Sequence, residues 1–434
     1  MLIYIISYLA AFLTARIQLY AVSGILLIAA ALYLFNSERI KSGNIINLRG
    51  LFSLSFVGGQ GLSCLKLSYL QKDWQLLTWL CFFLAFICFY LSFDFAKAHS
   101  DTAAADKKNK DAEALKSENM NIILYAISVI SLTSLIAFVI EVSMLRFIPL
   151  FTRGVPHAYS YFHISGLHYF TVMCVLVPAL SVIYVNYRLH IELVDKLVLG
   201  VSNFIALSIP LLCVSRFQFI FAIMLAGICF LRIRRDISVK KLILPAICII
   251  IPVYIVLTVA RSHNISYLNS IFEMKWKLPI FISQPYIYIA NNYDNFNELI
   301  TRLPAHSFGL KLLFPFFALT GLKFKFPELV NFPLYTTKTE LSTLTLFYDA
   351  YYDFSIAGII GFAVILGFIA CKLERLADNN PISFLFYSQF AVYFLFAFFT
   401  TWFSNPATWF YLGVTVVLYV AYYCYGIKII KKTV

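Results

Sequence analysis

Residues 242–260 form an apolar run that stops at an arginine: Leu242-Ile-Leu-Pro-Ala-Ile-Cys-Ile-Ile-Ile-Pro-Val-Tyr-Ile-Val-Leu-Thr-Val-Ala260, then Arg261. A helix needs about 20 such residues to cross the hydrocarbon core of a bilayer. Similar runs recur along the chain, at 2–15, 18–36, 51–70, 74–93, 121–140, 165–186, 197–214, 216–231, 347–370, 383–402 and 408–427. The sequence therefore predicts an all-α polytopic integral membrane protein with about 12 transmembrane helices.

The composition indicates the same class. Of the 434 residues, 61% are hydrophobic and 13% are charged, and the mean hydropathy is +0.82. A water-soluble domain of this size does not need so much apolar surface. We expect residues 1–434 to form a single membrane domain. The first span lacks the basic start and the cleavage site of a signal peptide, so we expect it to be retained.

No motif indicates a metal or a cofactor, and we expect neither. The nine cysteines lie mostly inside apolar runs and form no CxxC pair, which is typical of core residues. The sequence contains no phosphate-binding glycine loop, HExxH motif or Cys/His zinc pattern. The stretch Gly58-Gly-Gln-Gly61 lies within a predicted span, where close helix packing explains it better than nucleotide binding.

Basic residues predict the orientation of the spans. Lysines and arginines are concentrated in every second loop and in the C-terminal tail. Cytoplasmic loops carry this excess, so we place both termini in the cytoplasm. The charged stretch 94–120 is then a cytoplasmic linker, and residues 141–165 and 261–346 are outer loops. Within the larger loop, Gly309–Leu322 is apolar but short and contains Pro315, which favours an interfacial or re-entrant helix.

The arginines are candidates for binding an anion. Loop 261–346 carries eight basic and five acidic residues, a net charge of +3 that favours an anionic ligand. Arg216 and Arg261 lie at the mouths of spans. Each side chain could simply extend to the interface, or its guanidinium could grip phosphate oxygens as a rigid fork. Arg153 and Arg302 lie in outer loops, where a solvated cation is the simpler interpretation.

The histidines are candidates for proton transfer. Those on the outer side are His157, His163, His168, His263 and His306. A neutral histidine can take a proton from a sugar hydroxyl, although most interfacial histidines only make ordinary hydrogen bonds. His163 and His168 are five residues apart, which is not the spacing of paired helical metal ligands.

Two aspartates lie among tyrosines at the start of the span 347–370. Asp349 and Asp353 are four residues apart and would share one helix face. They could accept hydrogen bonds from sugar hydroxyls or form a structural ion pair with an arginine. The neighbouring Tyr348 and Tyr352 could stack on sugar rings or belong to the interfacial aromatic belt.

Several stretches can be compared with a known family. They are Pro149-Leu-Phe151, Tyr159–Phe170, Ser215-Arg216, the span that ends at Arg261, Tyr288-Ile-Ala-Asn-Asn292 and Tyr352-Asp-Phe-Ser-Ile-Ala-Gly358. Together with the many spans and one large outer loop, they resemble the oligosaccharide repeat-unit polymerases, the Wzy-type enzymes of O-antigen and capsule assembly. Ser355 stands where a glycine commonly follows the Asp-Phe pair.

The resemblance implies a GT-C-like, metal-independent glycosyltransferase. It would transfer the growing glycan from undecaprenyl diphosphate to the terminal sugar hydroxyl of a new lipid-linked unit. Arg216 and Arg261 would stabilise the leaving diphosphate, and a base would orient or deprotonate the acceptor. The candidates for that base are His163, His168 and Asp353. The candidates for substrate contacts are Arg153, Asn291, Asn292, Tyr293, Arg302, His306, Tyr348, Asp349 and Tyr352.

The same resemblance implies a place in the cell and partners. The place is the bacterial inner membrane, and the product is the O-antigen of lipopolysaccharide or a capsular polysaccharide. The partners are undecaprenyl-diphosphate-linked oligosaccharide, membrane lipid, a chain-length regulator and a flippase, with no nucleic acid. Two alternatives stay open. A flippase or transporter of lipid-linked oligosaccharide predicts internal repeats and charges along a pathway, and an O-antigen ligase shares the topology.

Overall fold

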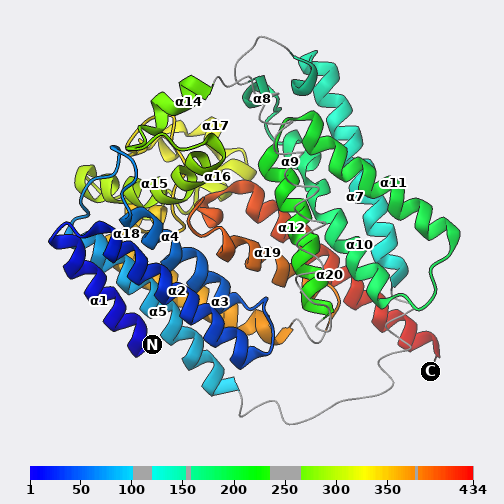
Figure 1. The fold of residues 1–434 in the computed structure, drawn as a ribbon. Coiled ribbons are helices and arrows are strands. Elements are labelled where there is room, and N and C mark those ends of the chain that lie inside the picture. The colour runs from blue at the N-terminus through cyan, green and yellow to red at the C-terminus, as the bar shows by residue number, and fades with distance from the viewer. Residues whose placement is uncertain (101–119, 153–157, 235–264, 377–379, 434) are drawn as a thin grey trace. The chain divides into compact units, whose positions relative to one another are not determined.

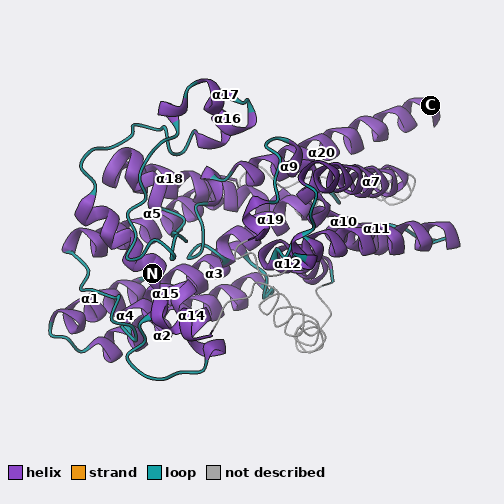
Figure 2. Ribbon diagram, turned by 90° about the horizontal axis from the view of Figure 1, so that it is seen from above, coloured by secondary structure: helices purple, strands orange, loops and turns teal. Residues whose placement is uncertain are grey.

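The described part of the chain is helical. A computed structural model describes residues 1–100, 120–152, 158–234, 265–376 and 380–433. Within these ranges the chain forms helices joined by loops, with no strand (Figures 1 and 2). Eight of the described helices have the length and hydropathy to cross a membrane. They are α2 (Tyr20–Ser42), α5 (Leu76–Ser100), α7 (Met120–Leu145), the continuous α9 to α10 (Leu167–Tyr187), α11 (Leu193–Leu212), α12 (Arg216–Ile233), α18 (Tyr348–Leu376) and α20 (Pro406–Thr433). The chain is thus a polytopic helical membrane protein, as predicted.

The remaining predicted spans have other forms. Two are short apolar helices, α1 (Leu2–Arg16) and α19 (Ser383–Leu395). The span predicted at 51–70 is a helix with a π-helical turn in its middle: α3 (Leu48–Phe52), η1 (Ser53–Val57) and α4 (Gly58–Cys64). The span predicted at 242–260 lies outside the described residues, as does most of the linker 94–120. The number of 12 spans therefore stays a prediction.

The chain divides into two compact units, which we describe separately. Unit 1 comprises Met1–Ala105, Asn264–Glu374 and Tyr393–Thr408. Unit 2 comprises Asp106–His263, Arg375–Val392 and Trp409–Val434.

Glycines let the first helices of unit 1 pack closely. A Cβ atom added to Gly24 of α2 would lie 2.7 Å from the carbonyl oxygen of Gly61 in α4, and one added to Gly61 would lie 2.9 Å from the carbonyl oxygen of Gly24. A Cβ atom at Gly59 would lie 2.4 Å from the Tyr293 hydroxyl. The packing role predicted for the glycine stretch is confirmed, because these positions have no room for a side chain.

Aromatic rings fill the core of unit 1. Phe52 lies 4.3 Å from Phe89 and 5.6 Å from Phe394, measured between ring centroids. Phe56 lies 5.2 Å from Phe347. Aromatic pairs at these separations add attraction beyond the burial of apolar area. The cluster joins the broken helix α3–η1–α4 to α5 and to the beginning of α18.

The outer loop predicted at 261–346 is more ordered than its sequence suggested. It contains α14 (Ile265–Phe272), α15 (Ile280–Arg302), α16 (Phe314–Leu319), α17 (Leu322–Lys325) and the turn η4 (Pro327–Leu329). The 23-residue helix α15 was not predicted. The short helix α16 lies within the stretch for which an interfacial helix was predicted.

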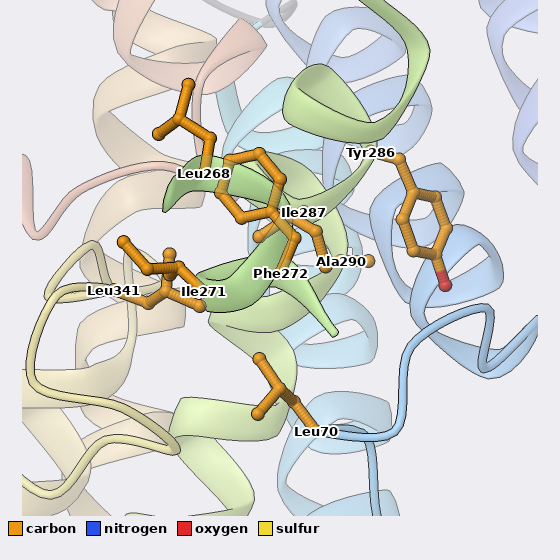
Figure 3. Packing of buried hydrophobic residues seen from close by; sticks show 8 residues of the cluster. All are labelled: Leu70, Leu268, Ile271, Phe272, Tyr286, Ile287, Ala290 and Leu341. Carbon is orange, nitrogen blue, oxygen red and sulfur yellow. The ribbon is translucent and has the colours of Figure 1, made fainter. Parts of the chain in front are cut away.

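A small apolar cluster anchors this loop. Leu268, Ile271 and Phe272 of α14 pack with Tyr286, Ile287 and Ala290 of α15, together with Leu70 and Leu341 (Figure 3). Burying such side chains stabilises the contact by roughly 1.5–3 kcal/mol for each large residue. The cluster therefore holds α14 and α15 against the loop that follows α4.

Polar contacts mark the two ends of unit 1. At one end Arg49, in the first turn of α3, pairs with Asp94 near the end of α5. At the other end the Tyr20 hydroxyl donates to Asp73 Oδ1 at 2.8 Å, and the Gln75 N–H donates to the Asn297 side chain at 2.9 Å. Loops predicted to share one side of the membrane therefore meet at one end of unit 1.

In unit 2, α12 runs parallel to the continuous helix α9 to α10. Near its end, Arg234 Nε donates to Asn186 Oδ1 at 3.0 Å. Nearer its start, Phe221 packs on Tyr411 at 5.9 Å, and the Tyr411 hydroxyl lies 3.4 Å from the Val172 carbonyl oxygen. The first contact joins the two helices directly, and the second links Phe221 to Val172 through Tyr411.

Candidate functional site

A buried carboxylate organises one end of unit 2. Glu141 lies inside the apolar helix α7 and is fully buried. A charge at such a position needs partners. Glu141 accepts hydrogen bonds from the Ile164 N–H at 2.9 Å, the Thr171 hydroxyl at 2.8 Å and the His168 Nδ1 at 3.1 Å. Because three donors converge on it, the carboxylate is both satisfied and fixed in position.

The turn before α9 brings these donors to Glu141. Gly166 has φ +86° and ψ −50°, a conformation that residues with a Cβ atom rarely adopt. The His168 N–H then donates to the Ile164 carbonyl oxygen at 3.0 Å and closes the turn. As a result, the Ile164 N–H and the His168 ring face the same carboxylate.

His168 is held at one ring nitrogen and open at the other. Since Nδ1 faces a carboxylate, which only accepts, Nδ1 carries a proton. None of the residues that the structure describes donates to or accepts from Nε2, and the side chain is 27% exposed. The exposed His163 lies edge-on to it, with 6.4 Å between ring centroids. His168 can therefore present Nε2 to a ligand.

Arg216 lies at the same end of unit 2. It is the first residue of α12 and is 8% exposed. The turn that leads to it has Val214 at φ +55°. Because α12 packs on η3 and α10, its first residue lies toward the end of unit 2 at which α9 begins.

In unit 1, Asp353 caps a turn of the outer loop. It is fully buried. Its Oδ1 accepts from the Ser307 hydroxyl and from the Lys311 N–H at 3.1 Å, and its Oδ2 accepts from the Leu312 N–H at 2.9 Å. Both oxygens are thus engaged by the chain that leads into α16. This arrangement favours a positioning role over that of a general base.

Asp349 pairs with a lysine. Lys311 Nζ lies 3.7 Å from Asp349 Oδ1 and 5.0 Å from the centroid of the Tyr352 ring. The Tyr348 hydroxyl accepts from the Tyr335 N–H at 2.8 Å and donates to the Tyr335 carbonyl oxygen at 3.0 Å. Tyr348 and Tyr352 are both buried. Their rings therefore pack inside unit 1 and do not form an open platform for sugar stacking.

The candidates on α15 also make internal contacts. Asn291 accepts from a threonine hydroxyl at 2.9 Å. Asn292 donates to the Phe398 carbonyl oxygen at 2.6 Å. The Tyr293 hydroxyl donates to the Phe56 carbonyl oxygen at 2.9 Å. All three side chains are buried. Their polar groups hold α15 against the rest of unit 1.

A buried aspartate follows them. Asp294 accepts from the Ser63 hydroxyl at 2.9 Å, Gln71 Nε2 at 3.1 Å and Trp74 Nε1 at 3.0 Å. Burial raises the pKa of Asp294 from 3.8 to about 6, although these hydrogen bonds act in the opposite direction. Asp294 is not among the site residues predicted from the sequence.

Two further candidates lie at the end of α15 and just beyond it. Arg302 has a 55% exposed side chain, lies 3.9 Å from Glu298 and lies 5.6 Å from the centroid of the Tyr335 ring. His306 Nδ1 lies 3.2 Å from the Tyr352 carbonyl oxygen. Arg302 is therefore accessible to a ligand, and His306 is tied to the start of α18.

The predicted site residues that the structure describes are thus found in both units. The structure brings His163 and His168 together in unit 2, which also contains Arg216. It gathers Asp349, Asp353, Tyr348, Tyr352 and His306 around the start of α18 in unit 1. Arg153 and Arg261 lie outside the described residues.

Two site residues were missed in the sequence. Glu141 was only the first residue of a predicted outer loop, and Lys311 was only one of the loop cations. A signal for Glu141 was present, since a single acid within an apolar span is costly unless it is partnered. For Lys311 the sequence carries no such signal, because its partner Asp349 is distant along the chain.

No family model, curated protein or solved structure matches the chain. The part of the chain that the structure describes also holds no group of three His, Cys, Asp or Glu side chains arranged for a metal ion.

Proposed function

We propose that this protein is a glycosyltransferase that polymerises lipid-linked oligosaccharide repeat units into O-antigen or capsular polysaccharide. The observation that carries the proposal is the fixed ring of His168, with an open Nε2, in the same unit as the buried Arg216. A guanidinium holds phosphate oxygens in a bidentate manner, and an imidazole accepts a hydroxyl proton near neutral pH. Glycosyl transfer from a lipid diphosphate uses both kinds of group.

In the proposed reaction one bond to the anomeric carbon forms and another breaks. The terminal hydroxyl of a new lipid-linked unit attacks the anomeric carbon of the growing glycan, and the bond from that carbon to the diphosphate oxygen breaks. The electron pair leaves with undecaprenyl diphosphate, and the hydroxyl proton passes to a base. Arg216 stabilises the charge that develops on the diphosphate. Because both reactants are tethered to the membrane, proximity supplies a large part of the rate.

Complementation of a deletion strain tests the proposal. The wild-type gene should restore long polymer, and Arg216→Ala should leave only single repeat units at an unchanged protein level. Arg216→Lys should not restore full chain length, because a lysine lacks the fork geometry. Arg234→Ala is the matched control, since Arg234 is an exposed arginine directly after the same helix and at its other end. It should make normal polymer.

The deletion strain also separates the alternatives. Accumulation of lipid-linked units on the cytoplasmic face would indicate a flippase. Long polymer that stays on its lipid carrier would indicate a ligase. Either result would contradict the proposal, as would wild-type polymer from Arg216→Ala.

A further inference from the structure

We infer that Glu141 holds His168 as the general base of the reaction, with Nε2 of His168 taking the proton of the acceptor hydroxyl. The inference rests on the proposed function and deepens it by naming the base. Glu141 is then a positioning residue, because it acts through His168. Its three hydrogen bonds, to Ile164, Thr171 and His168, supply the geometry.

Three residues were candidates for the base, and their environments differ. Asp353 accepts hydrogen bonds at both oxygens. His163 is exposed, and no carboxylate of the described residues pairs with it. His168 alone of the three combines a fixed ring, held at 3.1 Å from Glu141, with an open Nε2.

The pair provides the two things that a histidine base needs. The carboxylate accepts the Nδ1 proton, so the lone pair of the neutral ring lies on Nε2. When Nε2 takes the acceptor proton, the ring becomes a cation beside a buried anion, which favours the charged form. The Ile164 N–H and the Thr171 hydroxyl keep Glu141 from turning away. After the new glycosidic bond has formed, Nε2 returns the proton to water.

Other titratable groups surround α9. Those on the described elements that pack around it are Arg146, His163, Tyr169, Cys174, Cys213 and Arg216. Among these only His163 carries the same imidazole group as His168. A measurement on the imidazole therefore has to separate these two histidines, and an asparagine substitution at each one does so.

Nitrogen NMR of ¹⁵N-histidine-labelled full-length protein in detergent micelles tests the pair without any polymer assay. His168→Asn and His163→Asn assign the two signals. In the wild type we expect His168 to be protonated at Nδ1 when neutral. Glu141→Gln keeps the shape of the side chain but can donate as well as accept, so the neutral His168 ring should no longer be held to protonation at Nδ1. A neutral His168 protonated at Nε2 in the wild type would overturn the inference, as would an unchanged tautomer in the variant.

Polymerisation rates measured at several substrate concentrations test the role in catalysis. His168→Asn should lower the rate about 100-fold or more, the usual contribution of a general base. Glu141→Gln should lower kcat with little change in KM, a split that loss of structure alone would not cause. The polymerisation rate of His163→Asn should stay within about threefold of the wild-type rate.

The outcomes distinguish the inference from the proposed function. If the wild type makes polymer and Glu141→Gln matches its kcat, the inference fails and the proposed function stands. If the wild type makes no polymer, the proposed function fails and the catalytic role of the pair fails with it.

Discussion

Arg49 donates two hydrogen bonds to Asp94, from Nη1 to Oδ1 at 2.6 Å and from Nη2 to Oδ2 at 2.9 Å. Its guanidinium carbon also lies 3.3 Å from the centroid of the Tyr90 ring. The Tyr90 hydroxyl in turn donates to Glu38 at 2.8 Å, and Glu38 Oε2 lies 3.8 Å from Arg49 Nε. One buried arginine thus joins α2, α3 and α5 at one end of unit 1.

We expect Arg49→Ala to lower the free energy of unfolding by about 1–3 kcal/mol, because it leaves the buried Glu38 with only the exposed Lys41 as its cation. Arg49→Lys should recover only part of this loss, since a lysine cannot form the bidentate pair. Thermal unfolding in detergent measures both effects. The exposed Arg39 provides the control, and Arg39→Ala should change stability by less than about 0.5 kcal/mol.

Gly358→Ala should be strongly destabilising. An added Cβ atom would lie 2.0 Å from the carbonyl oxygen of Ala350, which cannot move without distorting α18. The matched substitution is Gly361→Ala, where an added Cβ atom meets nothing within 4 Å. That change should stabilise the same helix by up to about 1 kcal/mol through helix propensity. Equal melting temperatures for the two variants would contradict this account.

Ser355→Gly should stabilise the protein. Ser355 has φ +54° and ψ −141°, at the kink of α18, and such a conformation is strained for a residue with a Cβ atom. Glycine adopts it readily, so we expect a gain of about 1 kcal/mol. Denaturation in detergent measures the gain. A loss of stability would mean that the serine side chain contributes more than the strain costs.

Asp294 should make the stability of unit 1 depend on pH. Its pKa is raised from 3.8 to about 6, so the stabilising contribution of its neutral form is complete below 3.8 and is lost as the pH rises through about 6. The penalty for the ionised form at neutral pH is on the order of 3 kcal/mol. The difference in melting temperature between wild type and Asp294→Asn should therefore change across this window. A constant difference from pH 4 to about 7 would contradict the shift.

The helical membrane class was predictable because long apolar runs have few other stable forms. Helix α15 was not predictable in the same way. Its buried face carries Asn291, Asn292 and Asn295 with Asp294, and a polar stretch of this kind predicts a loop when its partners are unknown. The partners come from distant segments, such as Thr343, which donates to Asn292 at 2.6 Å.

The sequence predicted which types of residue form the candidate site better than it predicted the role of each residue. Arg216 was identified because a charge at the mouth of a span is costly, and His168 because a histidine on the outer side can take a proton from a hydroxyl. The role of Asp353 was not predictable, because main-chain N–H groups of Lys311 and Leu312 donate hydrogen bonds to it. Such donors have no signature in sequence. The same holds for Ser355, whose unusual backbone appears only in the fold.

The hydrogen bond from Arg234 to Asn186 joins the end of α12 to the end of α10. Asn186 lies 18 residues beyond His168, which corresponds to about 27 Å along a helix. An exposed hydrogen bond of this kind contributes about 1 kcal/mol or less, so its loss should leave α12 in place. Packing along the length of α12 against α10 and α11 therefore fixes Arg216 at the start of the helix.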